Sequence, residues 1–175
     1  KETTIMKKIL ALTAGMLLVA STAFARNIVT GTIEISGASN GFFSSRSGDG
    51  KAENVLNLGV EGLYFLMPNL GVGGLFNYTI YAGDVDGSSV RLGGEASYDF
   101  SIDEAMNAYA GVDLGLSSGD ISTASDGVFI GTNGGIRYFF TDAASINSGI
   151  SLAYNFGDGG EISFGVNFGL SIYLE

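Results

Sequence analysis

The sequence contains no cysteine and no histidine. The absence of cysteine excludes a disulfide framework, and the absence of both excludes the usual zinc ligands and the Ser-His and Cys-His nucleophilic pairs. Histidine is also the side chain best suited to exchange protons near neutral pH. The composition therefore argues against an enzyme, and it predicts no catalytic residue, no cofactor and no metal site.

Basic residues are also scarce, with 8 Lys and Arg against 18 Asp and Glu and a net charge of −10. Binding to nucleic acid phosphates needs clustered Lys and Arg, so nucleic acid is excluded as a partner. Proline occurs once, at Pro68, whereas glycine occurs 28 times among 175 residues. A single domain of this length, rich in glycine and nearly free of proline, is typical of many strands joined by turns.

The N-terminal residues have the pattern of an export signal. Lys7 and Lys8 precede the apolar run from Ile9 to Ala20, and the small residues of Ala23-Phe24-Ala25 follow. This run of 12 residues is shorter than the roughly 20 that a membrane-spanning helix needs, which disfavours a retained anchor helix. The pattern predicts a signal peptide cleaved after Ala25, with 1–5 as an upstream extension and 26–175 as the exported domain.

Apolar and polar residues alternate along the rest of the chain, which is the period of a β-strand with two different faces. In the clearest segment, Val90, Leu92, Ala96, Tyr98 and Phe100 lie on one face, opposite Arg91, Glu95, Ser97 and Asp99. Eight strands are predicted, at 28–36, 55–66, 70–81, 90–101, 106–117, 128–140, 146–156 and 162–174.

The connections between these strands alternate between short and long. Short ones lie at 67–69, 102–105 and 141–144, and longer ones at 37–53, 82–89, 118–127 and 157–161. Tight turns at one end and larger loops at the other are typical of membrane barrels. The predicted fold is therefore all-β, an eight-stranded antiparallel up-and-down transmembrane β-barrel.

The width of the barrel decides which face points outward. Eight strands enclose a space just wide enough for side chains, so the small and polar face is predicted to point inward. The apolar face would then form an outer belt suited to lipid. Aromatic residues near both ends of the strands fit interfacial girdles: Tyr64, Tyr98, Phe100, Tyr138 and Phe140 near the turns, and Phe76, Tyr78, Tyr154 and Phe156 near the loops. A soluble periplasmic ligand-binding barrel is the alternative.

Seven charged residues fall on the predicted inward face: Glu34, Glu61, Arg91, Glu95, Asp99, Asp113 and Arg137. A buried charge is costly unless it is paired. We therefore expect Arg91 to pair with Glu95 or Asp113, and Arg137 to pair with Glu61 or Asp99. Such pairs would plug the lumen, and a gated polar channel is the alternative.

The first long loop contains two of the five basic residues of the exported domain. Phe42, Phe43, Arg46 and Lys51 lie within it. Loops on rigid scaffolds often carry recognition, so this loop is a candidate surface-recognition site. A mobile Gly- and Ser-rich loop is the alternative.

Together these features resemble the outer-membrane β-barrel domain family, which includes the OmpA transmembrane domain and OmpX-like proteins. The resemblance rests on the signal ending in Ala-Phe-Ala, the strand-turn-strand from Tyr64 to Gly74, and the alternation from Phe164 to Leu174. It implies a location in the outer membrane of a Gram-negative cell. The implied partners are outer-membrane lipid and lipopolysaccharide, the export and barrel-assembly machinery, and an unidentified surface ligand.

Overall fold

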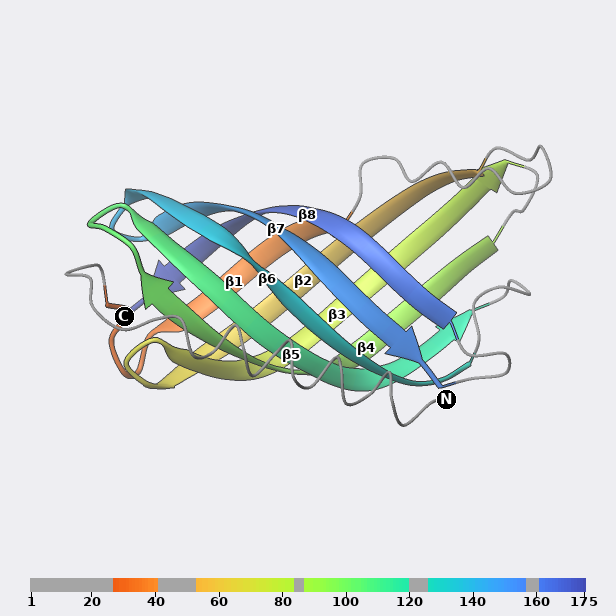
Figure 1. Ribbon diagram of the computed structural model, residues 1–175, viewed down its shortest axis with the longest axis horizontal. Coiled ribbons are helices and arrows are strands. Elements are labelled where there is room, and N and C mark those ends of the chain that lie inside the picture. The colour runs from red at the N-terminus through yellow and green to blue at the C-terminus, as the bar shows by residue number, and fades with distance from the viewer. Residues whose placement is uncertain (1–26, 41–52, 84–86, 120–125, 157–160) are drawn as a thin grey trace.

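The computed structural model describes residues 27–40, 53–83, 87–119, 126–156 and 161–175. Eight strands form one closed antiparallel barrel in sequence order, with β1 beside β8 (Figure 1). Their bounds are Ile33–Asn40 (β1), Glu53–Met67 (β2), Leu70–Gly83 (β3), Gly87–Ser101 (β4), Met106–Gly119 (β5), Gly127–Thr141 (β6), Ala144–Asn155 (β7) and Glu161–Leu174 (β8). No helix within these ranges is long and apolar enough to cross a membrane.

The predicted fold class is confirmed, and so is the direction of the alternation. Large apolar side chains on the outer face are well exposed, with Leu92 at 62%, Leu116 at 63% and Phe164 at 66%. Inward-facing Ser97 and Asp99 are each only 1% exposed. Since hydrophobic residues of a water-soluble domain normally fill its interior, this barrel has the opposite arrangement.

The three short connections lie at one end of the barrel, called here the turn end: Met67 to Leu70, Ser101 to Met106, and Thr141 to Ala144. The opposite end is called the loop end. Its connections at 41–52, 120–126 and 156–160 are longer, but only residues 84–86 separate β3 from β4, so the predicted long connection at 82–89 was wrong. Asn69 has a positive φ of 66° in the first turn, a conformation that asparagine tolerates better than most residues. Its amide N–H donates to the carbonyl of Ile28, and its side-chain oxygen accepts from the Ile28 amide at 2.8 Å.

These bonds hold residues 27–32 against the turn end, so β1 begins at Ile33 and the predicted strand start at Ile28 was wrong. The amide of Gly31 donates to the Phe65 carbonyl, and the amide of Phe65 donates to the Thr32 carbonyl, each at 2.9 Å. The segment therefore folds back to bond the end of β2.

An apolar cluster is buried where this segment meets the barrel. It consists of Ile28, Leu63, Phe65, Phe139 and Tyr173. The prediction that only small and polar residues face inward was therefore incomplete, because these large side chains occupy the interior at the turn end. Phe139 and Tyr173 rings pack with centroids 5.2 Å apart. The cluster lies at the turn end of the barrel.

Glycine is required where the backbones of neighbouring strands approach most closely. A Cβ at Gly93 would lie 2.6 Å from the Leu114 carbonyl oxygen, and a Cβ at Gly115 would lie 2.6 Å from the Cα of Gly93. A Cβ at Gly73 would overlap the carbonyl oxygen of Gly62. Glycines at such positions let a sheet bend sharply enough to close.

We predict that Gly73→Ala lowers the free energy of unfolding by about 1–3 kcal/mol, because the added methyl would force the backbones apart. Gly74→Ala is the matched control, since a Cβ there meets its nearest atom, the Gly93 carbonyl oxygen, at an ordinary 3.5 Å. Urea titrations of both variants in lipid vesicles, followed by tryptic protection, measure the difference. Equal stability of the two variants would contradict the close-approach argument.

Candidate functional site in the barrel lumen

The side chain of Arg137 on β6 lies at the centre of a buried polar network, with the residue 4% exposed. Its Nη1 forms an ion pair and hydrogen bond with Oε2 of Glu34 on β1, and its Nε lies 3.2 Å from Oδ1 of Asp99 on β4. Nη1 also donates to the Tyr173 hydroxyl of β8 at 2.9 Å. The guanidinium lies 4.7 Å from the ring centre of Tyr109 on β5. One cation therefore contacts side chains from four other strands.

The carboxylate of Glu34 also joins the first strand to the last. Its Oε1 accepts hydrogen bonds from the hydroxyls of Ser36 and Ser171, both at 2.7 Å. These two hydroxyls are themselves 2.6 Å apart. Because Ser36 is on β1 and Ser171 on β8, the bonds cross the line where the barrel closes.

The network continues into β7. The amide of Asn147 donates to Ser171 Oγ at 2.5 Å, and the hydroxyl of Ser145 donates to Asn147 Oδ1 at 2.9 Å. Ser145 also lies within hydrogen-bonding distance of the Tyr173 hydroxyl, at 3.1 Å. Hydrogen-bonded interior networks rigidify the structure that contains them.

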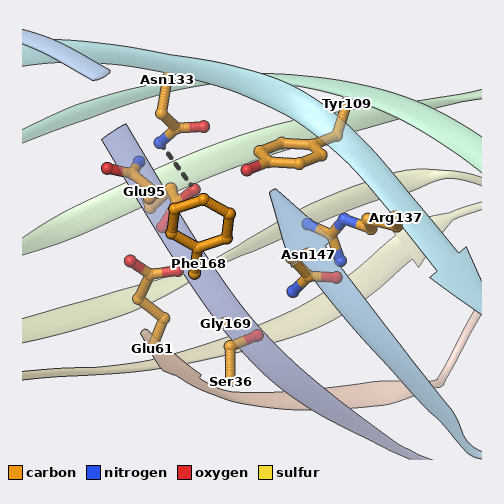
Figure 2. Close-up of a pocket in the computed structure, with 10 residues that line it drawn as sticks. Ser36, Glu61, Glu95, Tyr109, Asn133, Arg137, Asn147, Phe168 and Gly169 are labelled. Atoms are coloured by element: carbon orange, nitrogen blue, oxygen red, sulfur yellow. Dashed lines mark hydrogen bonds between the residues drawn. The ribbon is translucent and has the colours of Figure 1, made fainter. Parts of the chain in front are cut away.

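A small cavity of about 40 Å³ lies in the middle of the lumen. In Figure 2, the Glu61 and Glu95 carboxyl groups lie on one side of it and Arg137 on the other. The Nδ2 of Asn133 donates to Glu95 Oε1 at 3.1 Å, shown as the dashed line. This volume accommodates only a few water molecules.

The ion pairs predicted for the inward-facing arginines are only partly present in the structure. Of the two partners expected for Arg137, Asp99 lies within ion-pair distance. The partner that sequence reasoning missed is Glu34. No local signal indicates this pair, because β1 and β6 are not neighbours and the contact crosses the lumen.

Arg91 does not make the expected ion pair with Glu95 or Asp113. Its guanidinium donates instead to Ser163 Oγ at 3.3 Å and lies 5.4 Å from the ring centre of Phe129. Both contacts come from strands that only closure brings near Arg91. The Phe129 ring offsets part of the desolvation cost of the Arg91 guanidinium. A carboxylate was expected from the sequence to fill this role.

The candidate recognition residues Phe42, Phe43, Arg46 and Lys51 lie outside the described residues, as does the expected signal peptide at 1–25. Within the described ranges, no group of three or more acidic side chains is arranged to hold a metal ion.

A closed eight-stranded barrel with an apolar exterior and a polar interior defines a class, and the chain has the fold of the eight-stranded outer-membrane β-barrels. It is similar to the N-terminal β-barrel domain of Pseudomonas aeruginosa OprF, with 17% identity, a TM-score of 0.58, and coverage of 83% of this chain and 98% of that one.

The chain has a similar fold to two further solved structures. Neisserial surface protein A is 19% identical with a TM-score of 0.57, covering 81% of this chain and 94% of that one. The attachment invasion locus protein Ail of Yersinia pestis is 17% identical with a TM-score of 0.56, covering 83% of this chain and all of that one (100%). No family model and no curated protein sequence matches the chain. At these identities the likeness shows the fold.

We predict that Arg137→Ala lowers the free energy of unfolding by about 3–5 kcal/mol, because it leaves two buried carboxylates without their cation. Arg91→Ala is the matched control and should cost about 1 kcal/mol, since its contacts are one long hydrogen bond and one ring. Urea unfolding in detergent or vesicles compares the two. Similar losses for both variants would show that Arg137 has no special role.

Proposed function

We propose that the protein is a non-enzymatic barrel of the Gram-negative outer membrane that serves as a structural scaffold and presents its loops at the cell surface. The observation that carries this proposal is the apolar outer face. All eight strands contribute exposed large apolar side chains to it, among them Ile35, Leu58, Ile80, Leu92, Leu114, Ile136, Ile150 and Phe168.

The energetics of this face favour a lipid environment. Monomeric proteins in water rarely expose contiguous apolar patches of more than a few hundred Å², and exposure costs about 25 cal/mol per Å². In a bilayer this cost disappears, and closure of the sheet satisfies the backbone groups that lipid cannot. Most strands contain 14 or 15 residues, more than the roughly 9–11 that span the hydrocarbon at a tilt.

A plugged lumen fits this scaffold role. The apolar cluster around Phe65 lies at the turn end and the Arg137 network lies beside it, and in this proposal the two together would block the lumen. The cavity between Glu61, Glu95 and Asn133 is too small for a hydrated path on its own. These features support a barrel that acts through its surface.

The same proposal includes the route and the partners of the protein. The signal peptide at 1–25 would direct export, and the barrel-assembly machinery would insert residues 26–175 among outer-membrane lipid and lipopolysaccharide. The finer resemblance to the OmpA transmembrane domain and OmpX-like proteins stays a prediction. A surface role is in keeping with two of the similar structures, which are named as a surface protein and an attachment invasion locus protein.

The candidate surface site is the loop with Phe42, Phe43, Arg46 and Lys51. We predict that trypsin added to intact cells cuts the protein at Arg46 or Lys51, because the longer connections face outward in this orientation. The other basic residues of the exported domain are Arg26, Arg91 and Arg137, and the last two lie within strands. Immunoblotting of cell fractions detects the fragments.

The control is the double variant Arg46→Gln, Lys51→Gln, which should stay intact under the same treatment. Resistance of the unaltered protein on intact cells, with cleavage only after the outer membrane is opened, would contradict the proposed orientation. That result would instead favour the soluble periplasmic barrel.

The plugged lumen makes a separate prediction. Purified protein reconstituted in planar bilayers should give no discrete conductance steps, because the apolar cluster and the Arg137 network block the turn end. The empty bilayer and a reconstituted large porin are the controls. Reproducible steps that scale with protein concentration would favour the alternative of a small channel.

A further inference from the structure

The charges inside the described part of the barrel do not balance. Two arginines, Arg91 and Arg137, face five acids: Glu34, Glu61, Glu95, Asp99 and Asp113. Arg137 forms ion pairs with Glu34 and Asp99. Arg91 donates a hydrogen bond to Ser163 and lies over the Phe129 ring, and it forms no ion pair with a carboxylate among the described residues. The three remaining acids therefore have no ion-pair partner among the described residues.

Two of these acids, Glu61 and Glu95, border the same cavity of about 40 Å³. Glu95 is only 7% exposed, and its Oε2 is buried without a hydrogen-bond donor among the described residues. The Oδ1 of Asn133, which also borders the cavity, is likewise a buried acceptor that no described donor reaches. Buried acceptors and carboxylates without compensation carry a large desolvation cost.

The other groups around this cavity supply further oxygen atoms. Asn147, Asn167, Tyr109 and Ser36 line it, so amide and hydroxyl oxygens surround the two carboxyl groups (Figure 2). The site contains neither sulfur nor imidazole. The Arg137 guanidinium borders the cavity on the side away from the two carboxyl groups. The remaining polar side chains offer oxygen atoms of the kind that hard cations bind, namely carboxylate, carbonyl-type and hydroxyl oxygens.

We propose that this cavity is a binding site for a monovalent metal cation, Na⁺ or K⁺, held by Glu61 and Glu95 with Asn133 as a further ligand. The ion would compensate part of the negative charge of the two carboxyl groups, which form no ion pair with Arg137. A proton on one carboxyl group would need no space, whereas the cavity offers room for an ion. A divalent ion is disfavoured, since no three acids in the described ranges form a group suited to it.

The proposal goes beyond the membrane role and can be tested without it, because it depends only on the folded barrel. Purified protein in detergent micelles is unfolded thermally in NaCl, KCl or N-methylglucamine chloride at equal ionic strength. The organic cation is too large for the cavity. We expect the unfolding midpoint to be roughly 3–6 °C higher with the bound metal cation at about ten times its dissociation constant.

Two variants assign the effect to the cavity. Glu95→Gln should lose the cation-dependent shift, while Glu104→Gln should keep it, because Glu104 is exposed in the turn between β4 and β5. In crystals of the unaltered protein soaked in RbCl, an anomalous peak is expected between Glu61 and Glu95. This second measurement holds even where Glu95→Gln does not fold.

Several outcomes would overturn the proposal. One is equal midpoints in all three salts, and another is a midpoint that follows pH but not the cation, which would assign a proton to the carboxyl pair. Stabilisation by Ca²⁺ alone would also overturn it, as would a rubidium-soaked crystal without a peak in the cavity.

Discussion

The structure depends on one constraint, the closure of only eight strands into a barrel. Closure pairs the first strand with the last and leaves a lumen that just holds the side chains of one face. Inward positions therefore favour glycine, small polar residues, and large residues with a defined partner. Gly73 and Gly93 meet this constraint where backbones touch, and Arg137 meets it by bonding to side chains of other strands.

The lumen is consequently different along its length. At the turn end, Phe65 and Phe139 pack in an apolar cluster next to the ion pairs that Arg137 makes with Glu34 and Asp99. Near the middle, Glu61 and Glu95 border open space and lack a paired cation within the described residues. The first region has the properties of a structural core, and the second has buried oxygen atoms that no donor among the described residues reaches.

Alternation and connection length were enough to predict the fold, because both follow from local sequence. The predicted strand 106–117 matches β5 to within two residues, and Leu114 and Leu116 point outward as expected. Ile28 was misassigned because its alternation matches that of β1, while its actual partner, Asn69, is distant in sequence. The site was less predictable: which residues face inward is a local property, but which of them meet across the lumen depends on barrel geometry.

The hydrogen bonds of Glu34 with Ser36 and Ser171 lie where the first strand joins the last. Sliding β1 by a single position would turn the carboxylate toward the lipid, and sliding it by two would move the carboxylate about 7 Å along the strand, away from both Ser171 and Arg137. A misaligned closure would therefore leave the Glu34 carboxylate buried without its hydrogen-bond and ion-pair partners. These contacts therefore select one register between β1 and β8, because only that register avoids the free-energy cost of an unpaired buried carboxylate.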